Sequence, residues 1–208
     1  LVNLKNISLE SVSDHISSNS GIKKYFFTTG ANIKRKYNTS FYQFAGKSFS
    51  EIVLCNEAGE LVSIFSDRYG FNNPDSVWDS KKPSIILLGD SFVHGYCQSN
   101  GNKIADLIRI KNPNLNIINL ALAGNGPLSN LGVLSEYIND EMLIKKIYYF
   151  HLEGNDLPRD LPRELSRKEL LNYFDDKNQG LINKQKEIDQ NIISFTNDFR
   201  SQNLLLLK

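Results

Sequence analysis

The second half of the chain alternates short apolar runs with stretches of helical periodicity. The runs are rich in β-branched and aromatic residues and are bounded by turn residues, which is typical of buried strands. They cover residues 84–89, 115–120 and 147–152. Between them, residues 104–111 and 128–138 repeat apolar side chains at helical spacing. Strands separated by helices predict a parallel sheet with right-handed crossovers.

The last fifty residues change pattern twice. Residues 157–180 are charged and contain two prolines and a glycine, which predicts a loop-rich insertion with one short helix. Residues 184–200 predict an amphipathic helix. The leucine run at 204–207 predicts the start of a fourth parallel strand.

The first 75 residues have a different pattern of apolar and polar positions. Residues 1–45 show no clear period, and we expect them to wrap the domain without a core of their own. Residues 52–55 and 61–65 are strand-like runs around a turn-rich linker, which predicts a β-hairpin. The sequence therefore predicts an N-terminal extension over residues 1–75, followed by an α/β domain over residues 76–208.

Composition narrows the classes of partner. A chain of 208 residues suits one α/β domain with an appended element. With 24 Lys and Arg against 23 Asp and Glu, the net charge of +1 argues against a nucleic-acid partner or an anionic membrane surface. No stretch approaches the roughly 20 apolar residues of a membrane span, and no signal-peptide pattern opens the chain.

The two cysteines, Cys55 and Cys97, show neither metal-ligand spacing nor the pattern of a disulfide framework. We expect Cys55, which lies in an apolar run, to be a small buried hydrophobic residue. Two cysteines in this pattern fit an oxidising and a reducing compartment equally well. The sequence predicts no metal site and no cofactor.

Small and polar residues follow each of the three predicted strands. Ser91 comes after Gly89 and Asp90, and open α/β sheets bind ligands at the carboxyl ends of their strands. Gly124 and Asn155 follow the second and third strands. Acyl transfer needs a nucleophile and donors aimed at the developing oxyanion. We therefore expect Ser91 to be the nucleophile, with its own N–H, the Gly124 N–H and the Asn155 amide as donors.

These three segments resemble the sequence blocks of the SGNH (GDSL) hydrolase family. The matching segments are Gly89-Asp90-Ser91-Phe92, Ala123-Gly124-Asn125-Gly126 and Gly154-Asn155-Asp156. The stretch 153–157 is similar to bacterial members associated with surface-polysaccharide modification. The resemblance covers roughly residues 67–208. It implies a flavodoxin-like three-layer fold, Ser91 as nucleophile, and an oxyanion hole formed by the Ser91 and Gly124 N–H groups with Asn155.

The family's fourth block, Asp-x-x-His, has no match here, although it supplies the catalytic base. The histidines are His15, His94 and His151, and none has an aspartate three residues earlier. We expect the chain to be truncated, with the base in sequence beyond Lys208.

Several of these residues have a plain structural alternative. Asp90 and Ser91 are favoured helix caps. Asn125 suits a tight turn as well as a substrate contact. Asp156 would either hydrogen-bond the Asn155 loop or cap the next segment.

Other polar and aromatic residues are expected to be structural or peripheral. We expect His94 to point away from Ser91 along the helix, and His151 to be a satisfied core or edge histidine. Residues 148–150 are expected to be strand core rather than a carbohydrate platform. Trp78 is the freer candidate for sugar contact.

The function that this pattern predicts is a serine esterase or acetyl hydrolase acting on an acylated carbohydrate or a small ester. One alternative is an O-acetyltransferase that modifies a surface polysaccharide. The other is a catalytically silent carbohydrate-binding domain. Family analogy alone leans towards an extracytoplasmic or periplasmic location, and the sequence predicts no oligomeric state.

Overall fold

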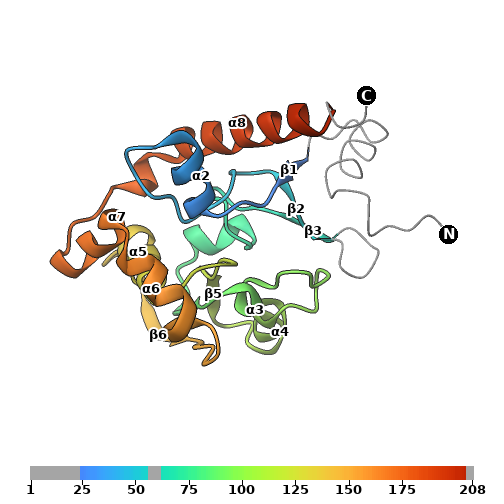
Figure 1. Ribbon diagram of the computed structural model, residues 1–208. Helices are drawn as coiled ribbons and strands as arrows, with labels where there is room; N and C mark the ends of the chain where they lie inside the picture. Colours follow the sequence, from blue (N-terminus) through green and yellow to red (C-terminus); the bar gives the residue numbers. More distant parts are fainter. Residues whose placement is uncertain (1–23, 56–61, 205–208) are drawn as a thin grey trace.

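The computed structural model describes residues 24–55 and 62–204. This part of the chain is a mixed α/β structure with two small sheets (Figure 1). One sheet has the strand order β5-β4-β6, and the other has the order β1-β2-β3.

The β5-β4-β6 sheet is entirely parallel, as the strand and helix alternation predicts. Its strands are β4 (Ser84–Leu88), β5 (Asn116–Asn119) and β6 (Ile144–Tyr149). The third strand begins three residues earlier than the apolar run that predicts it. In the centre, β4 is buried along its whole length because it is paired on both edges.

Helices α3 (Ser91–His94) and α4 (Ile104–Lys111) connect β4 to β5, and α5 (Pro127–Tyr137) connects β5 to β6. Alternate residues of β4 enter two different apolar clusters, as the two-residue period of a strand requires. Leu87 packs with Val93 of α3, whereas Ile86 packs with Val133 of α5.

The second sheet contains β1 (Tyr25–Phe26), β2 (Glu51–Cys55) and β3 (Val62–Phe65). Strand β1 runs parallel to β2, and β2 pairs antiparallel with β3. The linker of the predicted hairpin, residues 56–61, lies outside the described residues, so the hairpin stays a prediction. Helix α2 (Gly30–Tyr37) was not predicted by the sequence pattern; Thr29 Oγ1 accepts the Asn32 N–H and caps it, at 3.3 Å.

The segment after β6 is more helical than its composition predicts. It contains, in chain order, the π-helical turn η3 (Asp156–Asp160), α6 (Leu161–Leu165), α7 (Lys168–Leu171), η4 (Asn172–Asp175) and η5 (Leu181–Asn183). Prediction of a single short helix was therefore wrong. Leu170 and Leu181 are fully buried, so packing of isolated apolar side chains stabilises turns that have weak local preferences.

Helix α8 (Gln185–Leu204) is longer than predicted and lies along the molecule beside α2 and β1 (Figure 1). It includes Leu204, the first residue of the predicted fourth strand. The remainder of that predicted strand, residues 205–207, lies outside the described part of the chain. No described helix is long and apolar enough to cross a membrane.

Strand β6 corrects one expectation. Tyr148, Tyr149 and Phe150 are 44%, 43% and 38% exposed, so they are not strand core. Among the described strands only β4 pairs with β6, which leaves its other edge open. An apolar run therefore identified the strand correctly but not its burial, because burial depends on what packs against the strand.

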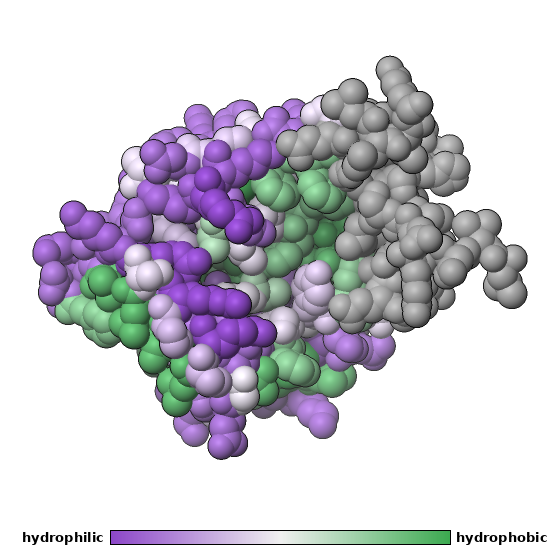
Figure 2. Space-filling view, in the orientation of Figure 1, coloured by the Kyte–Doolittle hydropathy of each residue, from purple (hydrophilic) through white to green (hydrophobic). Residues whose placement is uncertain are grey.

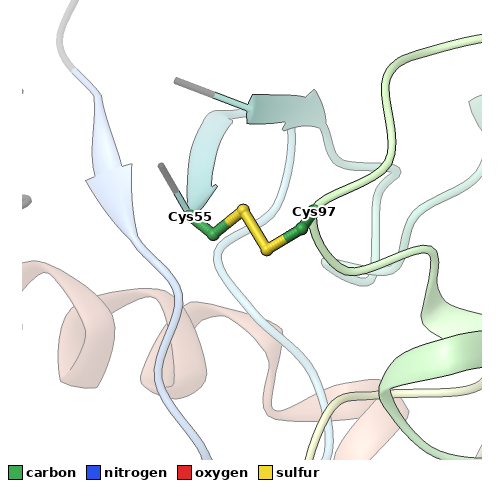
Figure 3. Close-up of a disulfide and its surroundings, with 2 residues drawn as sticks. All are labelled: Cys55 and Cys97. Atoms are coloured by element: carbon green, nitrogen blue, oxygen red, sulfur yellow. A yellow bond between two sulfur atoms is a disulfide. The ribbon is translucent and has the colours of Figure 1, made fainter. Parts of the chain in front are cut away.

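A disulfide between Cys55 and Cys97 joins the end of β2 to the loop after α3 (Figure 3). This corrects the expectation that Cys55 is simply a small buried hydrophobic residue. The two cysteines are 42 residues apart, and no spacing rule predicts such a pair. In the chain-entropy model, a loop of this length is worth about 4 kcal/mol of stability.

Candidate active site

Ser91 begins α3, directly after the central strand of the parallel sheet. A Cβ atom on Gly89 would lie 2.7 Å from Val93 Cγ2, so glycine is required for the chain to turn here. The carboxylate of Asp90 accepts the Phe92 N–H at 3.0 Å and caps the helix. Asp90, and not Ser91, therefore caps α3. The Ser91 hydroxyl has no hydrogen bond to any described residue and is partly exposed.

Two buried asparagines hold α3 from its C-terminal end. The Asn119 amide donates to Val93 O and the Asn72 amide donates to His94 O, each at 2.8 Å. The carbonyl groups of so short a helix have few partners within the helix itself. These two bonds satisfy them and fix the orientation of the helix that carries Ser91.

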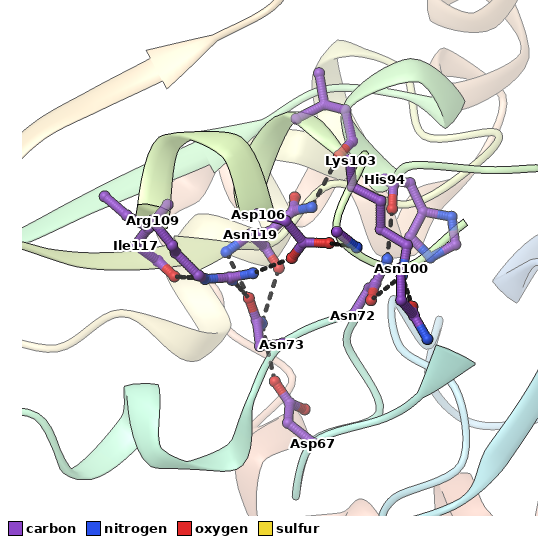
Figure 4. A network of polar contacts seen from close by, with 12 residues as sticks. Asp67, Asn72, Asn73, His94, Asn100, Lys103, Asp106, Arg109, Ile117 and Asn119 are labelled. Carbon is purple, nitrogen blue, oxygen red and sulfur yellow. Dashed lines mark hydrogen bonds and ion pairs between the residues drawn. The ribbon is translucent and has the colours of Figure 1, made fainter. Parts of the chain in front are cut away.

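Behind these asparagines lies a buried polar network (Figure 4). Asn73 accepts from the Asn119 N–H at 2.8 Å and from Arg109 Nη2 at 2.7 Å, and it donates to Asp67 at 2.9 Å. Arg109 also bonds Asp106 at 3.0 Å. The network links the N-terminal segment to β5 and α4, and thereby to α3.

Asp67 is the most heavily engaged carboxylate of this network. It accepts the N–H groups of Tyr69 and Phe71, both at 2.9 Å, in addition to the Asn73 amide. The indole of Trp78 donates to it at 2.8 Å. Burial raises the pKa of the Asp67 carboxyl, and these hydrogen bonds act in the opposite direction. The indole N–H of Trp78 thus belongs to the structural network, and a sugar contact by its ring stays a prediction.

Gly124 lies in the loop after β5 with φ of +87°, a left-handed conformation that favours glycine. The nearest atom to a Cβ placed there is Thr29 Cγ2, at 3.2 Å. Neither the Gly124 N–H nor the Ser91 N–H is hydrogen-bonded to another described residue. Both donors are therefore available to a ligand.

Asn155 follows β6, and its amide lies 3.5 Å from Asp90 Oδ2. This long contact connects the loop after β6 to the loop that carries Ser91. The structure thus brings Asn155 beside the residue preceding Ser91, and it leaves the amide largely free to donate elsewhere.

Asp156 anchors the Asn155 loop, which was one of its two predicted roles. It is buried, and its Oδ2 accepts the Tyr149 hydroxyl at 2.8 Å and the Leu152 N–H at 3.1 Å. His151 Nδ1 lies 3.1 Å from the same oxygen. Burial and this carboxylate raise the pKa of Tyr149. His151 is therefore a partly exposed edge histidine with its ring oriented by Asp156.

His94 is buried between the rings of Phe27 and Tyr96. Burial, with a smaller contribution from the charge of Lys103, lowers its pKa to about 3, so the imidazole is neutral at physiological pH. No histidine in the described ranges hydrogen-bonds Ser91, and His15 lies outside them.

Ser91 borders a depression of about 330 Å³. Phe92, Tyr96, Cys97 and Gln98 form its other walls. Because Cys97 is bonded to Cys55, the disulfide anchors one wall of this depression to the second sheet.

A second pocket, of about 410 Å³, contains Gly124 and four arginines that the sequence interpretation missed. We call it the arginine pocket; its arginines are Arg35, Arg159, Arg163 and Arg167. The last three are spaced four residues apart in the sequence and lie in η3, in α6 and directly before α7. That spacing was the available signal.

No group of histidine, cysteine and acidic side chains in the described part of the chain is arranged to hold a metal ion. A comparison with known protein families, curated proteins and solved structures finds no match to this chain. The resemblance to SGNH hydrolases therefore stays a prediction from the three sequence blocks.

Proposed function

We propose that the protein is a serine esterase of the SGNH type that removes an acyl group from a carbohydrate or a small ester. The observation that carries the proposal is the free hydroxyl of Ser91 at the carboxyl end of the central parallel strand. The unpaired N–H groups of Ser91 and Gly124, and the nearly free amide of Asn155, support it. The strand order β5-β4-β6 supports the flavodoxin-like layering that belongs to this proposal.

In the proposed reaction, Ser91 Oγ attacks the ester carbonyl while a base accepts the hydroxyl proton. The carbonyl oxygen becomes an oxyanion that accepts hydrogen bonds from Ser91 N–H, Gly124 N–H and Asn155. Collapse of this intermediate breaks the ester C–O bond, and the leaving alcohol takes up the proton. Water then attacks the acyl-serine, releasing the acid and restoring Ser91.

The base in this scheme lies outside the described residues, because no described histidine is bonded to Ser91.

The decisive experiment compares hydrolysis of 4-nitrophenyl acetate by the unmodified chain and by Ser91→Ala. We expect the substitution to lower the rate at least about 100-fold, because no acyl-serine can form. Ser135→Ala is the matched control and should keep the rate, since among the described residues the Ser135 hydroxyl bonds only Leu131 O on α5. Equal rates for the unmodified chain and Ser91→Ala would disprove the proposal.

His151 allows a second test of the base. We expect His151→Gln to lower kcat less than about tenfold, because Asp156 holds the ring and no hydrogen bond joins it to Ser91. Steady-state kinetics at pH 7 measure this. A 100-fold fall in kcat with unchanged KM would instead make His151 the base.

The disulfide bears on where such an enzyme works. Disulfides persist mainly in oxidising compartments. The Cys55–Cys97 bond therefore favours the extracytoplasmic location that belongs to this proposal.

A further inference from the structure

The arginine pocket lies between two helices that are distant in sequence. Arg35 belongs to α2, whereas Arg163 belongs to α6. On the face shown in Figure 2, strongly hydrophilic side chains gather over both helices, with a recess between them. Its volume of about 410 Å³ is within the usual range of small-ligand sites.

The positive charge of this pocket exceeds its negative charge. Four guanidinium groups line it against two carboxylates, Asp160 and Glu164. Glu164 is buried and accepts the N–H groups of Gly126 and Leu128, both at 2.8 Å, so it caps the start of α5. It is therefore committed to the backbone rather than to an arginine.

Asp160 is the carboxylate that the arginines share. Arg159 bonds it at 2.9 Å, and Arg163 approaches it only to 3.6 Å. Arg167 lies over the Tyr42 ring, with no ion pair among the described residues. Within residues 24–55 and 62–204, the guanidinium of Arg35 bonds only the amide oxygen of Asn32, at 3.1 Å. Much of the donor capacity of the pocket is consequently unused.

The pocket and the candidate active site share their elements. Gly124, one of the proposed oxyanion donors, forms part of the pocket wall. Asn155, another, immediately precedes the helical turn that carries Arg159, and the Arg159 N–H donates to Asn155 O at 3.1 Å.

We propose that the arginine pocket binds the carboxylates of an acidic carbohydrate and so presents an acyl group on that carbohydrate to Ser91. The planar guanidinium fork matches a carboxylate in geometry as well as in charge. This inference names the substrate class of the proposed esterase and rests on that function for the acyl group. The binding step does not depend on catalysis.

Binding is measured by isothermal titration calorimetry on the whole chain carrying Ser91→Ala, with trigalacturonate as the acidic probe and maltotriose as the neutral one. We expect trigalacturonate to bind and maltotriose to bind at least tenfold more weakly. Arg35→Gln and Arg163→Gln should each weaken trigalacturonate about tenfold, the value of one charge-assisted hydrogen bond. Raising the salt from 50 to 500 mM should weaken it further.

Lys111→Gln is the matched control, because it removes an exposed positive charge at the end of α4, outside the pocket. It should leave the affinity unchanged. Equal affinity for the two probes, or an affinity unchanged in both arginine variants, would overturn the inference. A failure of the proposed esterase function can be told apart from a failure of this inference. It would appear as hydrolysis that does not depend on Ser91, whereas these titrations contain no reaction.

Discussion

Two clusters in this molecule contain the same types of side chain but differ in how completely those side chains are hydrogen-bonded. The Asp67 network and the arginine pocket both combine arginines with carboxylates. In the Asp67 network, Arg109 is bonded to Asp106, to Asn73 and to Ile117 O. In the arginine pocket, Arg35 and Arg167 have no carboxylate partner among the described residues. The structural cluster and the proposed binding site therefore differ in how far their hydrogen-bond donors are satisfied.

The comparison also relates the two clusters to Ser91. The Asp67 network contacts the helix that carries Ser91, because the Asn119 amide donates to the carbonyl of Val93 in α3. The arginine pocket contains Gly124, one of the proposed oxyanion donors. Substitutions in the network should therefore change stability, and substitutions in the pocket should change binding.

The largest expected effect on stability is that of Asp67→Ala. Removing this buried carboxylate leaves two buried and two partly buried donors without their acceptor, and we expect a loss of about 3–5 kcal/mol in the free energy of unfolding. Urea denaturation measures it. Asp175→Ala removes an exposed carboxylate that pairs with Lys177, and it should cost less than about 0.5 kcal/mol. A similar small cost for Asp67→Ala would contradict the structural role of the network.

We expect an effect of intermediate size on the pH dependence of stability, and it comes from His94. The carbonyl of His94 accepts a hydrogen bond from Asn72 in the same polar region. The pKa of His94 is about 3 in the folded chain against an ordinary value of 6.5. Between these values the unfolded chain binds more protons, so stability is complete above pH 6.5 and falls as the pH drops towards 3. The slope from this group is about 1.4 kcal/mol per pH unit.

His94→Phe should remove that slope, because a phenyl ring beside Phe27 and Tyr96 does not titrate. Urea denaturation of both chains at several values between pH 4.5 and 6.5 measures the difference. Parallel curves for the two chains would show that His94 is not buried as a neutral imidazole.

The smallest expected effect on stability is in the arginine pocket. The Arg163 side chain is 64% exposed and only 3.6 Å from Asp160, so Arg163→Gln should change the free energy of unfolding by less than about 0.5 kcal/mol. The same variant should show the tenfold loss of trigalacturonate affinity. A large destabilisation would make this arginine part of the scaffold and would remove the contrast between the two clusters.

The strands of the parallel sheet and the position of Ser91 could be predicted from the sequence because their signals are local. A bounded apolar run followed by Gly89 predicts where β4 ends, and Ser91 follows within two residues. The structure agrees on the helical regions of α4, α5 and α8. It differs at β6, whose exposed tyrosines carry the same local signal as a buried strand.

The support of the site could not be predicted in this way. Asn72, Asn73 and Asn119 each donate a hydrogen bond to a carbonyl group 22 to 46 positions away. Nothing in their immediate neighbours distinguishes them from turn residues. The same holds for Trp78, which reads as a loop aromatic until Asp67 is seen beside its indole nitrogen.

By itself, then, the sequence determined the alternation of strands and helices, the parallel sheet and the serine at the end of its central strand. These depend on periodicity and on the conformational limits of glycine, which act over a few residues. Only the tertiary structure decided that Cys55 pairs with Cys97, that α3 is held by two asparagines, and that Arg35 and Arg163 line one pocket. Those relations join distant segments, and the packing of the whole chain determines which of them meet.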